Sequence, residues 1–155
     1  MRIHIVAIGQ RMPAWVQQAV TEYSKRMPAH CRIEFKELAA EHRGKNADLD
    51  RILNSEGASL LKAIPKGCLV IALDRSGKQF DTHALADHFR QWMTGGRDVA
   101  LVIGGPEGLS AQVLKQSDAV WSLSSLTFAH PLVRVLLVEQ LYRAWAITEN
   151  HPYHK

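Results

Sequence analysis

Apolar residues along the chain alternate between short strand-like runs and longer stretches with helical spacing. Residues 2–8 are rich in β-branched side chains and predict a strand that ends at Gly9. Residues 68–74 (CLVIALD) and 99–105 (VALVIGG) are continuous apolar runs, which are typical of strands covered on both faces. Two further strands are predicted at residues 31–38 and 119–123.

Helices are predicted between these strands, and capping residues mark where they begin. Asn46 can cap a helix in which Gly57 is a weak point. Asp81 and Ser110 can cap two later helices. This alternation predicts an α/β fold, a mainly parallel sheet with helices on both faces. The length favours a single domain over residues 1–155.

The last predicted helix is apolar on nearly all sides. His130 stands in the capping position and Pro131 at the first helical position. Apolar side chains then surround the stretch up to Ile147, whereas a surface helix needs only one apolar stripe. We therefore predict a homodimer that buries residues 131–147. A central helix buried within a monomer is the alternative.

Composition and charge narrow the class of protein without defining it. The net charge of +4 is compatible with a polyanionic partner, although charge alone indicates little. Cys31 and Cys68 form no CxxC pair and predict reduced thiols with no metal site. The first residues lack the features of a signal peptide, and no apolar run is long enough for a membrane span. These features predict a cytoplasmic protein.

Ligands of parallel sheets bind where the strands end, and three loops are candidates there. The first loop follows Leu73, the second contains Gly104, and the third comprises residues 123–130. The second loop, in LVIGGPEG, matches neither a Walker loop nor GxGxxG. Pro106 has no N–H to offer a phosphate, and Glu107 would repel one unless it turned away.

Such a loop suits an adenosine-like ligand that carries positive charge, and S-adenosylmethionine meets both conditions. The third loop, LSSLTFAH, places three hydroxyl side chains among apolar ones and could supply hydrogen bonds inside an apolar wall. A simple tight turn and an ordinary connection are the alternative interpretations of these two loops.

Several motifs together resemble the RlmH family of SPOUT-class methyltransferases. They are IGGPEGLS, LSSLTFAHPLVRVLLVEQLYRAW, RGKNAD and the ending NHPYHK. The resemblance implies a homodimeric enzyme that uses S-adenosylmethionine to methylate N3 of a pseudouridine in large-subunit ribosomal RNA, on the assembled ribosome. It also implies a trefoil knot in the C-terminal half of the chain. Ordinary rules for connections would instead predict an unknotted sheet.

The resemblance also assigns cofactor contacts to particular residues of this chain. It implies contacts at Leu73, Gly104, Leu123, Ser124, Ser125, Leu126, Thr127 and Phe128. We expect Gly104 to let the backbone approach the cofactor where a side chain would collide.

Candidates for placing or deprotonating the RNA base are Tyr153, His154, His130 and Arg143, with Arg134 a further possibility. In the resembled family the C-terminal tail lies near the active site across the dimer interface. His130 could be only a cap, and Arg134 and Arg143 could be solvated helix residues.

Contacts with RNA are expected from Arg43, Lys45 and Arg134, with Lys25, Arg26 and Arg32 as an extension. A solvated face is the plainer explanation of such charges. Two other classes of function remain open: a nucleotide-binding module that has lost catalysis, and an RNA-binding ribosome factor that uses no cofactor.

Overall fold

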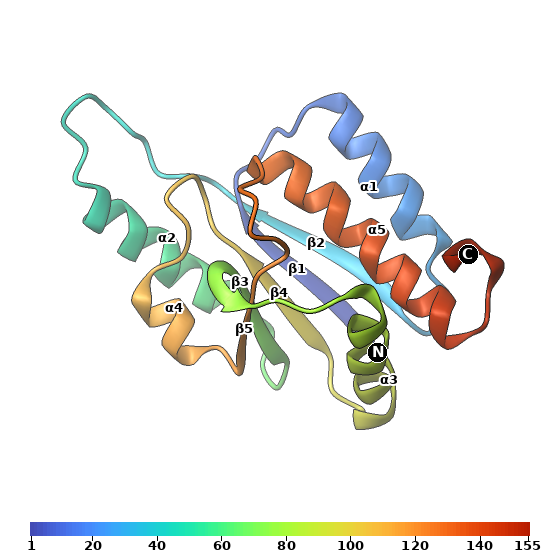
Figure 1. The fold of residues 1–155 in the computed structure, drawn as a ribbon. Coiled ribbons are helices and arrows are strands. Elements are labelled where there is room, and N and C mark those ends of the chain that lie inside the picture. The colour runs from blue at the N-terminus through green and yellow to red at the C-terminus, as the bar shows by residue number, and fades with distance from the viewer.

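All five strands pair in parallel in one sheet, with the order β2-β1-β4-β3-β5. The computed structural model describes all 155 residues (Figure 1). The strands are β1 (Arg2–Ile8), β2 (Arg32–Leu38), β3 (Leu69–Lys78), β4 (Val99–Ile103) and β5 (Ala119–Trp121). The helices are α1 (Ala14–Arg26), α2 (Leu49–Ala63), α3 (Thr82–Gly95), α4 (Ala111–Gln116), α5 (His130–Thr148) and the short 3-10 helix η1 (Pro152–His154).

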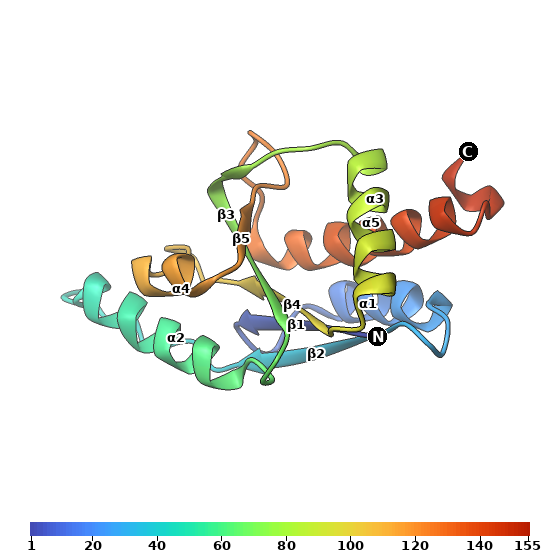
Figure 2. The ribbon, with the colours of Figure 1, turned by 90° about the horizontal axis from the view of Figure 1, so that it is seen from below.

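Helices cover both faces of the sheet, as the alternating pattern predicts. Side chains of a strand alternate between the two faces, so neighbours in β1 join different cores. Ile5 packs in the core formed with α3 and α5, whereas Val6 packs with α2 and α4. Figures 1 and 2 show α2 and α4 on one side of the sheet and α1 and α5 on the other. The continuous apolar runs of β3 and β4 are explained by this double cover.

The capping residues Asp81 and Ser110 are confirmed. The Asp81 carboxylate accepts a hydrogen bond from the N–H of Ala84, and the Ser110 hydroxyl accepts one from the N–H of Val113. Both bonds satisfy a backbone donor that the helix itself leaves unpaired.

The starts of two other helices differ from the expectation. Asp48, rather than Asn46, caps α2 by accepting from the N–H of Arg51. The chain still turns at residues 45 and 46, so the helix cannot begin there. At α5 the cap position is Ala129 and makes no side-chain bond, because His130 is already the first helical residue.

Gly57 is not a weak point of α2, because it makes room for a neighbouring element. The helix runs through Gly57 without interruption. A Cβ at this position would lie 2.3 Å from the Ser110 hydroxyl oxygen and 3.1 Å from the Ser110 Cβ. Helix α2 therefore lies directly against the start of α4.

The end of β3 is irregular where β5 lies beside it. Trp121 is in register with both Leu73 and Lys78, so the residues between these two bulge out of the sheet. The N–H of Ser122 donates to the carbonyl of Lys78, and β5 ends at Trp121 rather than at residue 123. The segment after β5 therefore lies against the β3–α3 connection. The trefoil knot stays a prediction of the resemblance.

We expect Gly77→Ala to destabilise the fold, because the backbone of Trp121 leaves no space for a methyl group. A Cβ at Gly77 would lie 2.4–2.7 Å from the backbone atoms of Trp121. Overpacking against backbone should lower the free energy of unfolding by about 2 kcal/mol. Urea unfolding at fixed protein concentration measures this change.

Gly95→Ala is the matched control, since a Cβ there meets nothing within 4 Å. Its helical position should make alanine neutral or stabilising by up to about 1 kcal/mol. Equal effects of the two substitutions would contradict the close contact at Gly77.

Candidate functional site

The three predicted loops meet around one cleft of about 660 Å³ at the carboxyl ends of the strands. The cleft is lined by the end of β3, by the loop after β4 and by the loop after β5, with the first turn of α5 closing one side. Parallel strands bring their carboxyl ends to the same edge, which explains why loops distant in sequence converge. The lining residues of the three loops are Leu73–Ser76, Ile103–Gly108, Ser122–Ser124 and Leu126–Phe128.

Most of the predicted cofactor contacts line this cleft. These are Leu73, Gly104, Leu123, Ser124, Leu126, Thr127 and Phe128. Ser125 is exposed and is not among the lining residues. The sequence analysis missed Asp74, Arg75 and Ser76, which the bulge of β3 turns toward the cleft.

Gly104 permits a close contact within its own loop, which differs from the role expected for it. A Cβ at Gly104 would lie 2.2 Å from the carbonyl oxygen of Gly108. The N–H of Gly108 donates to the carbonyl of Gly105 at 3.0 Å, and Gly108 has a φ of +83°. The loop is therefore folded tightly on itself, and a side chain at Gly104 would open it.

The cleft is lined by two acids and one arginine, and Asp74 is the acid that no basic side chain pairs. Asp74 and Glu107 contribute carboxylates and Arg75 contributes one cation. The Asp74 carboxylate accepts hydrogen bonds from the backbone N–H and the hydroxyl of Ser76. The Glu107 side chain is turned toward Arg43, whose hydrogen bonds hold the pKa of Glu107 below its ordinary value.

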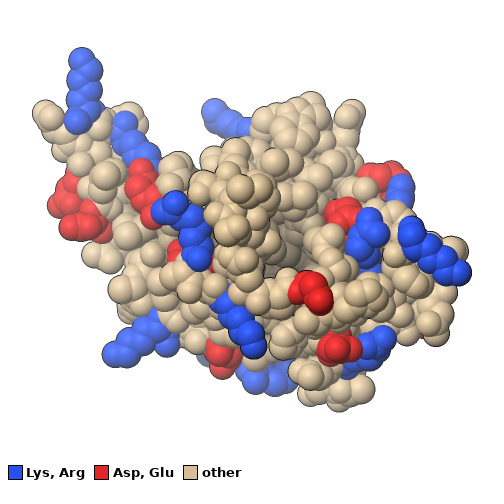
Figure 3. All heavy atoms as spheres, viewed as in Figure 1, with Lys and Arg blue, Asp and Glu red and all other residues tan.

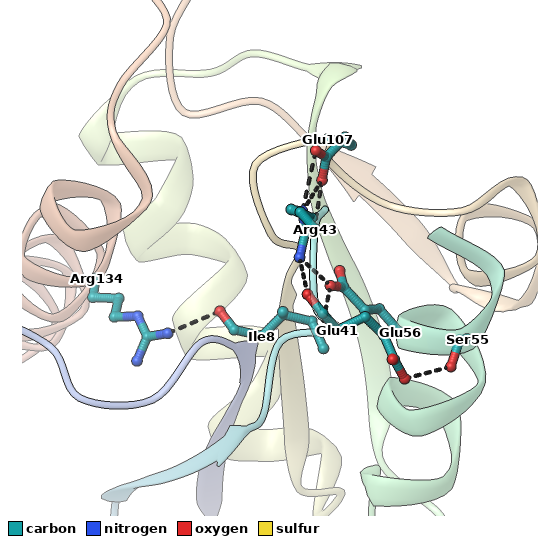
Figure 4. Close-up of polar contacts among 7 residues, drawn as sticks. All are labelled: Ile8, Glu41, Arg43, Ser55, Glu56, Glu107 and Arg134. Atoms are coloured by element: carbon teal, nitrogen blue, oxygen red, sulfur yellow. Dashed lines mark hydrogen bonds and ion pairs between the residues drawn. The ribbon is translucent and has the colours of Figure 1, made fainter. Parts of the chain in front are cut away.

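Arg43, expected to contact RNA, is engaged by two carboxylates. Its Nη2 lies 2.5 Å from Glu107 Oε2, and its Nη1 lies 2.8 Å from Glu56 Oε1. Figure 4 shows the guanidinium between these two acids. Lys45 on the same loop is exposed and remains free to meet a phosphate.

Arg134, the third expected RNA contact, lies inside the protein, so that prediction is wrong for this protomer. Its side chain is 1% exposed. Its Nη2 donates to the carbonyls of Ile8 and Gly9 at 3.1 and 2.8 Å, and Nη1 lies 3.4 Å from Glu37 Oε2. Arg134 anchors α5 to the sheet and presents no surface to RNA or solvent, which also excludes the solvated-residue interpretation.

His130 lines the cleft, and its surroundings disfavour the protonated imidazole. Partial burial lowers its pKa, and the nearby Arg134 and Arg43 guanidinium groups lower it further. A neutral imidazole can accept a proton, although a lowered pKa makes it a weaker base.

The C-terminal tail lies far from the cleft of its own protomer. The Tyr153 hydroxyl donates to Glu139 Oε1 at 3.1 Å and lies 3.3 Å from the Tyr23 hydroxyl. Arg143 binds the same Glu139 carboxylate at 2.6 Å and stacks on the Tyr153 ring. His130 and Arg143 are separated by about 20 Å along α5. The two side chains of one protomer therefore cannot belong to the same site.

Tyr153 is not a ready base in this arrangement. Burial and the hydrogen bond with Tyr23 raise the pKa of Tyr153, and the negative Glu139 raises it further. A phenolate is therefore disfavoured there. The His154 ring contacts the carbonyl oxygen of His151 through Nδ1.

Basic side chains do not form one continuous patch on the face shown in Figure 3. Lys and Arg are interspersed there with Asp and Glu. No helix of the structure combines the length and the apolar character that crossing a membrane requires. The fold and cleft define an α/β protein with a cleft at the carboxyl edge of its sheet that is large enough for a small molecule.

Comparison with known proteins identifies the family. The family model described as "Predicted SPOUT methyltransferase" matches residues 1–154. The "Ribosomal RNA large subunit methyltransferase H" of Thioalkalivibrio sulfidiphilus (strain HL-EbGR7) is 57% identical over 155 residues, covering 100% of this chain and 99% of that protein. The chain belongs to the SPOUT methyltransferase family.

Solved structures with low sequence identity share the fold. A probable methylase family protein from Haemophilus influenzae Rd KW20 aligns with a TM-score of 0.57 at 14% identity, covering 96% of this chain and 68% of that one. A probable methyltransferase from Bordetella pertussis Tohama I gives 0.53 at 15% identity, covering 92% and 95%. The predicted fold class is thereby confirmed.

We expect His130 to titrate below its ordinary pKa of about 6.5. The folded protein then binds this proton less readily than the unfolded chain does. The contribution of His130 to stability is therefore present at neutral pH and declines as the pH falls below about 6.5. Arg134→Met should raise the pKa of His130 part of the way toward its ordinary value. The shift should not be complete, because the imidazole stays partly buried.

An NMR titration of the histidine Cε1 protons measures both values, with the His130 signal assigned from a His130→Gln variant. A His130 that titrates at or above 6.5 in the native protein would contradict the expectation. So would an unchanged pKa in a folded Arg134→Met variant.

Proposed function

We propose that this protein transfers a methyl group from S-adenosylmethionine to N3 of a pseudouridine in large-subunit ribosomal RNA, acting on the assembled ribosome. The proposal includes a homodimer of single-domain chains, residues 1–155, in the cytoplasm. The observation that carries it is the convergence of three loops on one cleft in a member of the SPOUT methyltransferase family. The name of the 57% identical relative supports ribosomal RNA as the substrate.

The cleft suits the proposed donor in size and in charge. A cavity of about 660 Å³ falls within the range of small-molecule sites. The folded glycine loop and the loop at residues 122–128 would hold the adenosine part through backbone groups and small hydroxyl side chains. The carboxylate of Asp74 suits a positive centre, whereas that of Glu107 is paired with Arg43. When bound, S-adenosylmethionine supplies a methyl group activated by its positive sulfur.

The position of the tail supports a site completed by a second copy of the chain. Tyr153, His154 and Arg143 cannot reach the cleft of their own protomer while the tail packs on α5. Leu126 and Leu132, which are 68% and 38% exposed, provide apolar surface next to the cleft. Leu137 is 4% exposed and belongs to the core of its own protomer, so the dimer face lies on the Leu132 side of α5.

The protein's role in the chemistry is to orient the acceptor nitrogen and accommodate the loss of one proton. Holding two reactants in line accounts for a large part of such a rate enhancement. Neutral His130 at the cleft can accept a proton, whereas the raised pKa of Tyr153 favours stacking on the base over deprotonating it. Arg143 beside Tyr153 is paired with Glu139, and its guanidinium would stabilise an anionic base only where it also contacts that base.

The test of this function uses S-adenosylmethionine with a radiolabelled methyl group and ribosomes that lack the modification. We expect label in large-subunit RNA, mapped to a single pseudouridine, with far less transfer to free RNA. Calorimetry on the protein alone should show binding of the donor.

Each alternative function gives a different outcome. Donor binding without methyl transfer would indicate a module that has lost catalysis. Absence of donor binding would indicate a ribosome factor that uses no cofactor. Label at another position would correct the substrate.

We expect two inactive variants to restore activity when their subunits are mixed. Deleting residues 151–155 removes the tail, and Gly104→Val opens the donor loop. Each change should lower methyl transfer by roughly 100-fold or more, the scale on which misplacement acts. A mixed dimer joins an intact loop from one subunit to an intact tail from the other, so the mixture should regain about a quarter of full activity.

The variants are mixed, allowed to exchange subunits and assayed on ribosomes. The tail deletion should retain donor affinity within a few-fold. Activity of the mixture no higher than that of the separate variants, with exchange verified, would place each tail at its own subunit's cleft. Full activity of the tail deletion alone would remove the tail from the site.

A further inference from the structure

Residues 39–48, which join β2 to α2, form a loop that we call the strap. It has no helix or strand, and its side chains are mostly exposed. Arg43 and Ala47 are the exceptions. An otherwise exposed connection therefore places one basic side chain against the body of the protein.

The Arg43 guanidinium joins three parts of the chain. Its Nε lies 2.9 Å from Glu107 Oε2 in the glycine loop at residues 104–108. Its Nη1 donates to the carbonyl of Glu41 at 2.9 Å and lies 2.8 Å from Glu56 Oε1 in α2. The planar fork of arginine suits such simultaneous contacts, which a lysine cannot reproduce.

The ion pair between Arg43 and Glu56 is strengthened by the burial of the Glu56 carboxylate. Glu56 is 3% exposed, and besides Arg43 it also accepts a hydrogen bond from the N–H of Glu41. A buried carboxylate without its cationic partner is strongly unfavourable. The two carboxylates raise the pKa of Arg43, and Arg43 lowers the pKa of Glu107, so this pair stays charged at neutral pH.

The glycine loop rests on the same residues. A Cβ at Gly105 would lie 3.0 Å from Glu56 Oε2 and 3.2 Å from Arg43 Nη2. Just after the loop, Ser110 packs on Gly57, the neighbour of Glu56. Helix α2 thus supports the glycine loop at both ends, through Glu56 near Gly105 and through Gly57 near Ser110. Arg43 links Glu107 of the loop to Glu56 of this helix.

We propose that Arg43 is a positioning residue for the methyl-donor site. Its side chain clamps Glu107 to Glu56 and thereby holds the glycine loop in the shape that receives the donor. This inference rests on the proposed function. A loop rich in glycine loses much conformational freedom when it is ordered. A clamp that orders it beforehand increases donor affinity, because less of that freedom is lost on binding.

The test compares Arg43→Met, Arg43→Lys and Glu107→Gln with the native protein. Calorimetry gives the Kd for S-adenosylmethionine, and methyl transfer gives kcat and the KM for ribosomes. We expect Arg43→Met and Glu107→Gln each to raise the donor Kd by about tenfold or more, and Arg43→Lys to raise it less. At saturating donor, kcat and the ribosome KM should stay within about threefold of native values, which separates positioning from catalysis.

Two further variants act as controls. Arg51→Met removes an exposed arginine of α2 that makes no ion pair in the structure, and it should leave the donor Kd unchanged. The double variant Arg43→Met/Glu107→Gln should bind the donor about as weakly as Arg43→Met alone, because both substitutions break one interaction. Glu107→Gln leaves the buried Glu56 paired, so it reports on the clamp even where Arg43→Met unfolds.

The outcomes distinguish this inference from the proposed function. Native protein that does not bind the donor would overturn the proposed function, and with it this inference. Native binding with an unchanged Kd in Glu107→Gln and in folded Arg43→Met would overturn the clamp alone. A raised ribosome KM with an unchanged donor Kd would make Arg43 an RNA contact instead.

Discussion

A buried guanidinium joins the last helix to the sheet, and the geometry of the cleft depends on it. Arg134 reaches the carbonyls of Ile8 and Gly9 at the carboxyl end of β1 and lies near Glu37 at the end of β2. Burial lowers the pKa of Arg134, and the Glu37 carboxylate opposes this effect. Because Arg134 lies about one turn after His130, these contacts fix the first turn of α5 beside the cleft.

The same anchor decides where the other end of α5 points. The helix starts at the cleft and leads away from it, so Arg143 and the tail lie at the far end of the molecule (Figure 1). There the tail is held by Tyr23 of α1 and Glu139 of α5. A site that requires both ends of α5 therefore requires two chains, which follows from the direction of the helix alone.

The sequence was most informative where a pattern is local. The continuous apolar runs predict β3 and β4, and the rule for parallel strands predicts that the loops at Leu73 and Gly104 share a site. Contacts between charged residues far apart in sequence were not predictable, because no local pattern pairs Arg43 with Glu107. The burial of Arg134 did leave a signal, since it shares a helical stripe with Leu137, Val138 and Leu141.

The charges near the proposed reaction indicate that orientation contributes more than basicity. His130 is neutral but has a lowered pKa, and Tyr153 has a raised one, so neither is tuned toward strong proton abstraction at neutral pH. Arg43 pairs with Glu107, which reduces the negative charge that this acid presents to the cleft. An imide N–H is itself moderately acidic, so its ionisation does not require a strong base. In the proposed dimer, the fold would therefore promote methyl transfer chiefly by fixing two binding surfaces, one from each subunit, in line with each other.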